Sequence, residues 1–545
     1  MAKIKASSFL EEIRNNIKEK DAVKANIVLS HIAEMDMAVQ AEALELFWHS
    51  PAEFAIPLLA AVLDKFPYLI NSFPETKERL VARIYEAPGV YLELLQNPRL
   101  ECRGFLVELA GEIGLDDAYH VLMALLVNEE EHDVLAKVVV ALGEIGDPGA
   151  AANIAELLYT ENQDLVFVAI RALGQLGSPT AIQRLYEKLG QRQDYDFAIL
   201  DVFFQVQSQE AIDKLNKTLA SHHAHIRSTG KEKLVAMGSK AIPVLAENLR
   251  QDDPDLQIHT LNVMGDIGDE GAISSIRKLI HNQPRDANVR FAAYETLGRL
   301  PLAKGAYVLA AGLHDPVDNV RSAAAAAIDS NYNDILAAGL KNMLRSEDAE
   351  ALLLVQTVIC TQSGRIFIDL LDNPFFKEHA LEHLREKAHA EVREFFVETL
   401  KAAGQQELAA KLEDRPAAAA AAAVRKRVVA IDDSKMILGI YRSMLHALGY
   451  EPFIFLEPEA AVEEVRRLQP AAVLTDLNMP GITGIEVTRR LRETFSKEKL
   501  PIIMVTTQNE NQDNEAARLA GVDEILHKPF TKESIGEVLT RYLGA

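Results

Sequence analysis

The sequence predicts a protein of two parts, in which an all-α repeat solenoid is followed by an α/β domain built on a doubly wound parallel sheet. Three observations predict this fold class. Short apolar motifs that end in glycine recur about every thirty residues through much of the chain. A segment rich in Pro, Ala and basic residues, RPAAAAAAAVRKR, then interrupts the pattern at residues 415–427. Beyond it, apolar runs of strand length alternate five times with helical segments.

The composition excludes several classes of protein. Of the 545 residues, 48% are hydrophobic and 25% are charged, as in soluble globular proteins and unlike disordered chains. The formal charge is −23, and residues 425–545 hold 16 Lys and Arg against 18 Asp and Glu, so the acidic surplus lies almost wholly on residues 1–424. Such a surplus argues against DNA binding, because contacts to phosphates need basic side chains.

Cysteines and apolar runs indicate the compartment. The two cysteines, Cys102 and Cys360, cannot form a disulfide framework, and this favours a reducing cytoplasm. Residues 1–20 lack the continuous apolar core of a signal peptide, and nowhere do eighteen apolar residues run together. We therefore expect a cytoplasmic protein without a membrane span.

The repeat is marked by residues that end helices. Five glycines each close an apolar helical stretch: Gly114, Gly146, Gly177, Gly238 and Gly268. They are 32, 31, 61 and 30 residues apart, and the interval of 61 holds a degenerate member at Val206-Gln207. Leu300-Pro301 adds a member in which Pro is the breaker. Gly ends a helix at low cost because it adopts the left-handed conformation. Helix pairs of this size cannot bury an apolar face alone, so they must stack into a solenoid.

Residues 105–330 resemble the HEAT and HEAT-like repeat family, and residues 331–413 resemble it more weakly. The motif residues are Asp286, Val289, Arg290, Ala293 and Leu297, and then Asp318, Val320, Arg321 and Ala324. The resemblance implies that Asp286, Arg290, Asp318 and Arg321 stabilise the stack by bridging successive repeats. We expect residues 105–413 to form the solenoid and residues 1–104 to form an irregular helical cap.

Histidines in the solenoid offer two alternatives in which it would be an enzyme. His379, Glu382 and His383 match the H-x-x-E-H pattern of a zinc peptidase family, but they lie in a charged segment typical of an exposed helix face. The second alternative is a di-iron hydroxylase or a bilin lyase, which some HEAT-like proteins are. The hydroxylases use repeated His-Glu pairs, but adjacent His-Glu pairs in successive repeats are missing here, and no Asp or Glu stands at ligand spacing from His222, His223 and His225. We therefore expect no cofactor in the solenoid and interpret it as a surface for protein partners.

Residues 414–426 are predicted to be a linker. Pro416 stops a preceding helix, and the alanines after it have no side chain large enough to hold a core. Alanine also favours a short helical extension, which would be marginal by itself. The linker therefore separates the solenoid from a C-terminal domain at residues 427–545.

The C-terminal domain alternates strands and helices. The strands are predicted from the apolar runs RVVAID, EPFIFL, AAVLTD, PIIMVTT and EILHKP, and the helices near residues 434–448, 457–468, 484–495, 510–520 and 532–543. Continuous apolar runs are typical of strands that are buried on both faces of a parallel sheet. Ligands of such sheets bind at the carboxyl ends of the strands.

Polar side chains stand at the ends of four of these strands: Asp432, Asp433, Asp476, Thr506, Thr507 and Lys528. Because the carboxyl ends of parallel strands meet at one edge, we expect these side chains to converge. Three carboxylates at one edge repel each other and need a cation, for which Mg²⁺ (or Mn²⁺) with oxygen ligands is suited. A lysine and a hydroxyl opposite them would suit a phosphoryl group.

Residues 427–545 resemble the response-regulator receiver family over their whole length. The resemblance is carried by VVAIDDS, LTDLNMPGITGIE, IIMVTTQ and HKPFT. It implies a flavodoxin-like sheet of five parallel strands in the order 2-1-3-4-5. It also implies that Asp476 is the phosphoacceptor, which takes its phosphoryl group from the phosphohistidine of a sensor kinase.

The same resemblance implies the roles of the neighbouring residues. Asp433, Asp476 and the main-chain carbonyl of Asn478 would bind Mg²⁺ directly, and Asp432 would act largely through water. Thr506 and Lys528 would bind the phosphoryl oxygens. The peptide bond before Pro529 would be cis.

Two residues depart from the family pattern. The switch position, three residues before Lys528, is usually Tyr or Phe, but here it is Ile525. Thr507 stands where a small residue is common and adds crowding over the site. Neither change touches the phosphorylation chemistry, so both bear on how the signal leaves the domain.

The leading hypothesis is a cytoplasmic two-component response regulator whose output is protein binding by the solenoid. Its partners would be a sensor histidine kinase or phosphotransfer protein, unidentified partners of the solenoid and, through receiver pairing, a second copy of the chain. It would catalyse only its own phosphoryl transfer and dephosphorylation. A constitutive scaffold with the receiver as docking unit or phosphate sink is the first alternative, and a metalloenzyme or lyase in the solenoid is the second.

Overall fold

The computed structural model describes residues 6–302, 307–388, 390–413, 425–477, 479, 481–506, 511–528 and 530–544. The chain falls into two compact units, Met1–Lys214 and Leu215–Ala545, and each is described by itself. The predicted domain boundaries at residues 104 and 413 stay predictions. The C-terminal domain belongs to the same compact unit as the helices from residue 215 onward. Most of the predicted linker, residues 414–424, lies outside the described residues.

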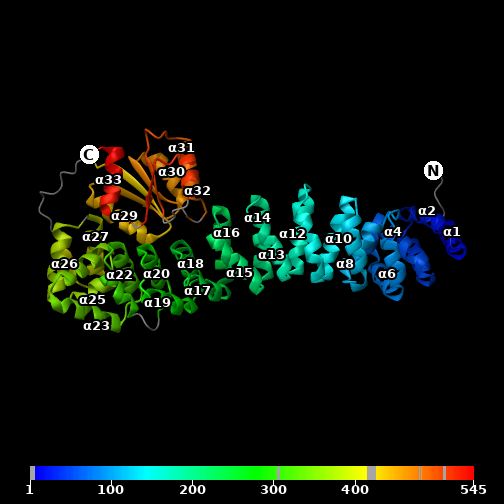
Figure 1. Ribbon diagram of the computed structural model, residues 1–545, viewed down its shortest axis with the longest axis horizontal. Coiled ribbons are helices and arrows are strands. Elements are labelled where there is room, and N and C mark those ends of the chain that lie inside the picture. Colours follow the sequence, from blue (N-terminus) through cyan, green and yellow to red (C-terminus); the bar gives the residue numbers. More distant parts are fainter. Residues whose placement is uncertain are drawn as a thin grey trace. The chain divides into compact units, whose positions relative to one another are not determined.

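The described part of the first unit is built from helices (Figure 1). Their bounds are α1 (Ala6–Glu19), α2 (Ala22–Leu29), α3 (Met37–Glu45), α4 (Ala52–Lys65), α5 (Tyr68–Ser72), α6 (Pro74–Glu86), α7 (Pro88–Leu95), α8 (Arg103–Glu112), α9 (Tyr119–Asn128), α10 (His132–Ile145), α11 (Ala151–Glu156), α12 (Gln163–Leu176), α13 (Pro179–Lys188) and α14 (Gln193–Val206). The next helix, α15 (Gln209–Lys217), spans the boundary between the units.

Glycines set the spacing of the repeat in the first unit. Gly146 and Gly177 end α10 and α12 at φ of 80° and 54°, and Gln207 takes the same left-handed conformation at 50° after α14. Gly143, inside α10, allows a close approach to α12, because a Cβ there would lie 3.0 Å from Ala172 Cα. The helices α8, α10, α12 and α14 therefore pack against one another in sequence order, as the repeat predicts.

The helices of the second unit continue the pattern of pairs. They are α16 (Ala224–Met237), α17 (Ile242–Asn248), α18 (Pro254–Ile267), α19 (Ile273–His281), α20 (Ala287–Arg299), α21 (Val308–Ala311), α22 (Asp318–Ser330), α23 (Asp334–Met343), α24 (Ala349–Cys360), α25 (Gly364–Leu370), α26 (Pro374–Glu386), α27 (Ala390–Ala402) and α28 (Gln406–Glu413). Helix α20 packs between α18 and α22. Gly298 makes this packing close, because a Cβ there would lie 3.0 Å from Ala327 Cα.

Five parallel strands form the sheet of the C-terminal domain, in the order β2-β1-β3-β4-β5. They are β1 (Arg427–Ile431), β2 (Glu451–Phe455), β3 (Ala472–Asp476), β4 (Ile502–Thr506) and β5 (Glu524–His527). Helices follow every strand: α29 (Lys435–Ala447), α30 (Pro458–Leu468), α31 (Gly484–Arg492), α32 (Asn511–Ala520) and α33 (Lys532–Leu543). The predicted fold class and strand order are confirmed.

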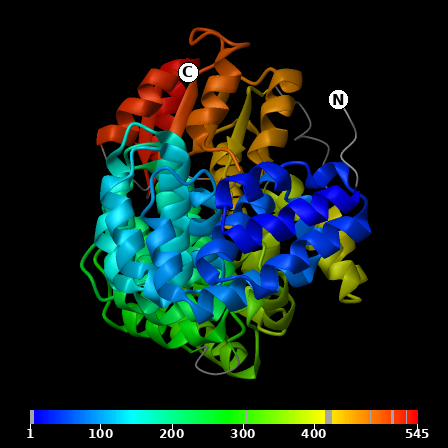
Figure 2. The same ribbon diagram turned by 90° about the vertical axis from the view of Figure 1, so that its right-hand side faces the viewer.

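The sheet is covered on both faces, as both views show (Figures 1 and 2). One apolar cluster joins β1, β3 and β4 to α29 and α33, and it includes the buried Tyr441 and Leu539. The other face packs against α30 and α31 through residues such as Val465 and Leu491. The three central strands, β1, β3 and β4, are buried on both faces, and this explains their continuous apolar runs.

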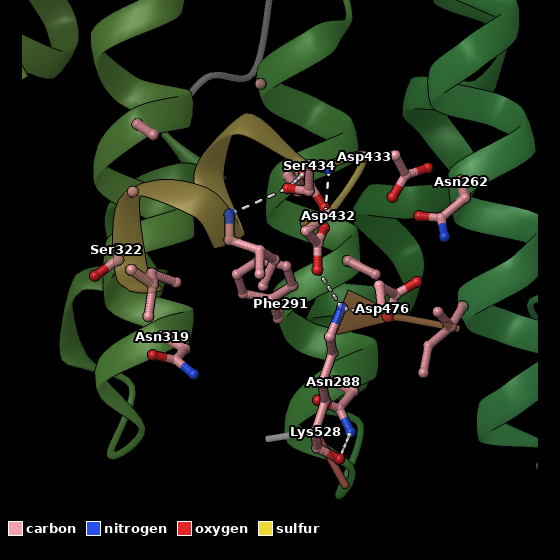
Figure 3. Close-up of a pocket in the computed structure, with 18 of the residues that line it drawn as sticks. Asn262, Asn288, Phe291, Asn319, Ser322, Asp432, Asp433, Ser434, Asp476 and Lys528 are labelled. Atoms are coloured by element: carbon pink, nitrogen blue, oxygen red, sulfur yellow. Dashed lines mark hydrogen bonds and ion pairs between the residues drawn. The ribbon is translucent and has the colours of Figure 1, made fainter. Parts of the chain in front are cut away.

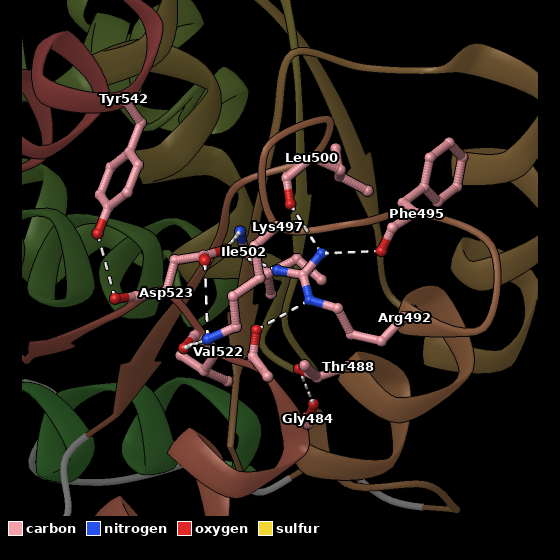
Figure 4. A network of polar contacts seen from close by, with 11 residues as sticks. Gly484, Thr488, Arg492, Phe495, Lys497, Leu500, Ile502, Val522, Asp523 and Tyr542 are labelled. Carbon is pink, nitrogen blue, oxygen red and sulfur yellow. Dashed lines mark hydrogen bonds and ion pairs between the residues drawn. The ribbon is translucent and has the colours of Figure 1, made fainter.

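A buried ion pair ties the amino-terminal ends of β4 and β5 to α31 (Figure 4). Arg492 donates to Asp523 at 2.6 Å and to the carbonyls of Leu500 and Gly521 at 2.9 Å each. The Asp523 carboxylate also accepts from the amide of Ile502 at 2.7 Å. The Arg492 guanidinium and the Asp523 carboxylate therefore both have hydrogen-bond partners besides each other. This network holds together the edge of the sheet opposite the predicted site.

Candidate phosphoacceptor site

The predicted site residues lie at one edge of the sheet. Asp432 follows β1, Asp476 is the last residue of β3, Thr506 is the last residue of β4 and Lys528 follows β5. The parallel register pairs Ile431 with Thr475 and Asp476 with Val505, which brings these strand ends level. The convergence expected from the sequence is therefore what the topology produces.

The Lys528 ammonium lies between two carboxylates. Its Nζ is 2.8 Å from Asp432 Oδ2 and 2.8 Å from Asp476 Oδ1. Asp432 is fully buried and Asp476 is 7% exposed. An unpaired charge would be costly at such a depth, so Lys528 serves as the counter-charge of this arrangement.

Burial and mutual repulsion act on the carboxylates. Burial raises the pKa of Asp432 to about 7, the charges of Asp476 and Asp433 raise it too, and Lys528 opposes them. Desolvation by the surrounding protein raises the pKa of Asp433 to about 6, again with help from Asp476, although the residue keeps an exposed surface. Burial by itself would lower the pKa of Lys528, but Asp432 and Asp476 hold it well above the usual value. The edge carries more negative charge than one ammonium balances.

The donor set fits a hard divalent cation. Asp432, Asp433 and Asp476 offer only carboxylate oxygens, the ligands that Mg²⁺ prefers. The raised pKa values of Asp432 and Asp433 come first from desolvation and then from repulsion among the carboxylates, and a cation would relieve that repulsion. Among the described residues, no three His, Cys, Asp or Glu side chains are already grouped to hold an ion. In this arrangement the Lys528 ammonium holds two of the carboxylates instead.

Backbone geometry positions the two acidic loops. The amide of Ser434 donates to Asp432 Oδ1 at 2.9 Å, and Ser434 Oγ accepts from the amide of Ile437 at 3.2 Å, which caps α29. Gly484 begins α31, and a Cβ at this position would lie 2.1 Å from the Asp476 carbonyl oxygen. Only glycine can stand there without moving Asp476.

Thr506 is the last residue of β4 and Ile525 lies in β5. These are the two positions to which the family resemblance assigns the conformational switch. Thr506 is buried, and its carbonyl accepts from the amide of Lys528 at 2.8 Å. Ile525 is half-buried and packs against an apolar cluster that contains Leu477 and Met504. Ile525 is therefore part of the packing between β5 and α32. Asn478, Thr507 and Pro529 lie outside the described residues, so their predicted roles stay predictions.

Sequence reasoning missed four residues that the solenoid brings to this edge. Asn288, Phe291 and Glu295 of α20 and Asn319 of α22 contact the loops after β1 and β5 or the domain core. Figure 3 shows Asn288 and Phe291 beside Asp432, Ser434 and Lys528. The three positions of α20 lie on one helix face, away from buried residues such as Val289 and Leu297. An aromatic residue outside the buried stripe of a repeat was the available signal.

A cavity of about 1290 Å³ opens between these elements. Its wall includes Asp432, Asp433, Asp476 and Lys528 on one side and residues of α16, α18, α20 and α22 on the other. In Figure 3, Asp433 points toward Asn262 of α18. The charge of Lys231 lowers the pKa of Asp433, and that of Glu295 raises it. The solenoid is therefore part of the electrostatic surroundings of the site.

The predicted repeat-stabilising residues divide into two roles. Asp286 caps its own helix by accepting from the amides of Asn288 and Val289. Arg290 reaches the next repeat, where Nε and Nη2 donate to the two oxygens of Asp315 at 2.7 and 3.1 Å. Asp318 pairs with Arg321, which also donates to the Asp315 carbonyl. The bridge between repeats is thus made by Arg290 and Asp315, a residue absent from the predicted set.

The histidines of the solenoid form no cluster of ligands among the described residues. His379 Nδ1 lies 2.9 Å from the Phe375 carbonyl within α26. Burial and the nearby Lys387 lower the pKa of His383. None of the described helices is long and apolar enough to span a membrane.

Comparisons with known proteins agree with the two parts of the fold. The response regulator receiver domain matches residues 428–540, and HEAT repeats match residues 120–200 and 242–329. The chemotaxis protein CheY1 of Helicobacter pylori is 34% identical over 122 residues, which are 22% of this chain and 97% of that protein. The polar-differentiation response regulator DivK of Brucella anthropi is 28% identical over 119 residues, with the same two coverages.

Two of the solved structures that match come from a chemotaxis protein and from a receiver domain. Chemotaxis protein CheY4 of Vibrio cholerae is 28% identical and matches 22% of this chain and 100% of its own, with a TM-score of 0.21. The receiver domain of a sensor histidine kinase from Pseudomonas aeruginosa, with a magnesium ion coordinated in its active site cleft, is 26% identical with the same coverages and TM-score.

Proposed function

Because the chain belongs to the response regulator receiver family through residues 428–540, and because HEAT repeats precede that domain, we propose that Asp476 accepts a phosphoryl group and thereby controls protein binding by the solenoid. The receiver makes this a protein of phosphorylation-dependent signalling. The observation that carries the proposal is the position of Asp476 at the carboxyl end of β3, with the Lys528 ammonium 2.8 Å from its carboxylate. The donor we propose is a sensor histidine kinase or a phosphotransfer protein of the cytoplasm.

The chemistry needs only a carboxylate and positive charge around it. An oxygen of Asp476 forms a bond to phosphorus while the P–N bond of the donor phosphohistidine breaks, and the imidazole leaves with a proton from water. Lys528 is placed to pair with a phosphoryl oxygen, and the Thr506 hydroxyl, at the end of the neighbouring strand, to donate to another. A magnesium ion bound by Asp432, Asp433 and Asp476 would neutralise the charge of the transferred group. Hydrolysis later releases inorganic phosphate and restores the carboxylate.

The added charge supplies the switch. A phosphoryl group brings about −1.5 to −2 charges and three acceptor oxygens to a buried edge. Groups that touch this edge, above all Lys528 and Thr506, must then rearrange, and this biases the receiver between two states. We propose that the change alters which proteins the solenoid binds.

A phosphorylation assay tests whether Asp476 accepts a phosphoryl group. Full-length protein is incubated with Mg²⁺ and acetyl phosphate, and incorporation is measured by intact mass and by borohydride reduction of the acyl phosphate. We expect stoichiometric incorporation in the parent chain and in Glu463→Gln, which changes a carboxylate that is 72% exposed on α30. Asp476→Asn should incorporate none, since an amide is not a nucleophile here. Equal incorporation in Asp476→Asn and in the parent would refute the assignment.

A second candidate is a constitutive scaffold whose receiver is a docking unit. Ile525 favours it, because its half-buried side chain packs in an apolar cluster and has no ring to reorient. Pull-downs by the full-length protein, with and without beryllofluoride, separate the two candidates. Partner sets that differ support the phosphorylation switch, and identical sets support the scaffold.

A further inference from the structure

Two asparagines of the solenoid hold the segment that follows β5. Asn288 Nδ2 donates to the Lys528 carbonyl at 2.6 Å, and Asn319 Nδ2 donates to the Phe530 carbonyl at 3.3 Å. Side-chain amides that are satisfied by main-chain carbonyls fix a loop in position without needing a particular side chain on the loop. Helices α20 and α22 therefore hold the loop after β5 in place, and this loop carries Lys528, which pairs with Asp476.

A carboxylate of the solenoid holds the loop after β1. Ser434 Oγ donates to Glu295 Oε1 at 2.5 Å, while the Ser434 amide donates to Asp432. Hydrogen bonds to a charged acceptor are about twice as strong as neutral ones. The loop after β1, which carries Asp432 and Asp433, and the loop after β5, which carries Lys528, are thus both tied to one face of α20.

Between these polar contacts lies an apolar anchor. Phe291 packs against the receiver core cluster that includes Val428, Leu438 and Tyr441. At the perimeter, Glu391 of α27 lies 3.4 Å from Arg442 Nε on α29. Phe291 is partly buried, and an aromatic side chain surrounded by polar contacts is the usual anatomy of a specific protein interface. We call Asn288, Phe291, Glu295 and Asn319 the docking face.

We propose that the docking face is a partner of the receiver within the same chain, and that it closes the phosphoacceptor edge to protein-borne phosphohistidine while leaving it open to small acyl phosphates. The proposal rests on the proposed function of Asp476. The proposal follows from the position of α20 and α22, which already contact the loops at the carboxyl edge of the sheet. A donor protein must bring its histidine, and the surface that carries it, against the carboxyl ends of β1, β3 and β5.

The space that α20 leaves beside Asp476 decides which donors can reach it. A helix with its side chains is about 10–12 Å across, and α20 already contacts both loops beside Asp476. The cavity of about 1290 Å³ reaches Asp476 and Lys528, and drug-sized ligands occupy pockets of roughly 300–1,000 Å³. Acetyl phosphate therefore fits the cavity, whereas a helical donor domain has to displace α20 first.

Separation of the receiver from the docking face would couple donor binding to signalling. If only the undocked state binds a protein donor, the apparent affinity for that donor falls in proportion to the undocked fraction. By the same linkage, a bound donor drives the receiver off the docking face and exposes Phe291. Reception of the signal and release of the solenoid surface are then a single event.

Maleimides of two sizes test access to position 476 without needing a known donor. The full-length chain carries Asp476→Cys together with Cys102→Ala and Cys360→Ala, so that one thiol remains. N-ethylmaleimide and a maleimide on a long polyethylene glycol chain share one reactive group, and the ratio of their rates, measured by intact mass, reports access for small and large molecules. The same chain with Phe291→Glu opens the docking face. Its matched control is Ile335→Glu, on a residue that is 74% exposed on α23.

We expect the ratio of small to large reagent to be high in the parent and in Ile335→Glu, and to fall by roughly tenfold in Phe291→Glu, as for an equilibrium shifted toward the undocked state. An unchanged ratio in Phe291→Glu would overturn the proposal. If Phe291→Glu lowers the helical content, the pair Asn288→Ala with Asn319→Ala replaces it, because these changes remove contacts to the receiver without adding a charge.

Failure of the proposed function gives a different result. The Phe291→Glu chain with native Asp476 is treated with acetyl phosphate and Mg²⁺. Absence of incorporation there refutes Asp476 as phosphoacceptor, whatever the maleimide ratio is. Normal incorporation together with an unchanged ratio refutes only the closure by the docking face.

Discussion

Ser434 and Glu295, which are 139 residues apart in the chain, share a hydrogen bond of 2.5 Å. The serine caps the first receiver helix and lies next to Asp433, whereas the glutamate belongs to a repeat helix. A single contact thus joins the acidic edge of the receiver to the solenoid. The receiver is consequently packed onto the helices that it is proposed to regulate, and this arrangement leads to several measurable consequences.

Lys528 should be essential for the stability of the metal-free protein. Lys528→Met leaves Asp432 and Asp476 buried without their counter-charge, and the loss of one partner of a buried pair costs about 3–5 kcal/mol. Urea unfolding of the unit that contains the receiver should show this loss in the presence of a chelator. Millimolar Mg²⁺ should restore part of it, because the cation replaces the ammonium.

The double variant Lys528→Met with Asp432→Asn is the control for that prediction. Removal of a carboxylate together with the lysine lowers the uncompensated charge, so the double variant should be more stable than Lys528→Met alone. A double variant less stable than both single variants would contradict the role of Lys528 as counter-charge.

Gly484→Ala should disturb the phosphoacceptor itself. The new Cβ would lie 2.1 Å from the Asp476 carbonyl oxygen, and overpacking of this kind costs about 1–3 kcal/mol. Both the thermal midpoint and incorporation from acetyl phosphate should fall. Gly439→Ala is the matched control, since nothing lies within 4 Å of a Cβ there, and a helical Gly→Ala change should stabilise by about 0.5–1 kcal/mol.

Arg290 should contribute strongly to the contact between successive repeats. It makes a bidentate pair with Asp315 and donates to the carbonyls of Pro284 and Arg285. Arg290→Ala leaves a largely buried Asp315 carboxylate unpaired, at a cost of about 3–5 kcal/mol. Arg250→Ala, which removes an exposed pair with Glu247, should cost less than about 1 kcal/mol. Equal losses in urea unfolding would argue against the bridge.

His259 should make the second unit less stable as the pH falls. Burial, with the charges of Arg227 and Lys231, lowers the pKa of His259 to about 3. Below the ordinary value of about 6.5 the unfolded chain binds a proton that the folded chain does not, so the free energy of unfolding falls as the pH drops from about 6.5 toward 3.

The slope of that loss is measurable. It approaches about 1.4 kcal/mol per pH unit for one such histidine, and it should flatten in His259→Gln. His281→Gln, on an exposed residue of α19, should leave the slope as in the parent. Parallel slopes in all three proteins would contradict the assignment.

Local patterns were sufficient for the architecture. Glycines at helix ends predicted the repeat, and even the degenerate member Gln207 takes the left-handed conformation expected of a glycine there. Apolar runs predicted all five strands, and the pattern is most complete in β1, β3 and β4, which are buried on both faces. Asp432, Asp476, Thr506 and Lys528 could be placed together because parallel strands bring their carboxyl ends to one edge.

Contacts between segments that are far apart in the sequence could not be predicted from local patterns. The bridge from Arg290 goes to Asp315 instead of to a residue of the repeat motif, and this choice depends on the turn that enters α22. The packing of the receiver with helices from residue 215 onward is likewise not indicated by any local pattern. Such outcomes depend on surfaces that meet only after folding.

The sequence by itself determined the fold class, the strand order through its family resemblance, and the residues at the edge of the sheet, because each of these follows from periodicity within a short window or from strand topology. Only the tertiary structure decided that Lys528 binds both Asp432 and Asp476 and that Phe291 and Glu295 of α20 cover the same edge. The physical reason is that side-chain pairing and docking depend on shape and charge brought together across more than a hundred residues, where no local period carries information.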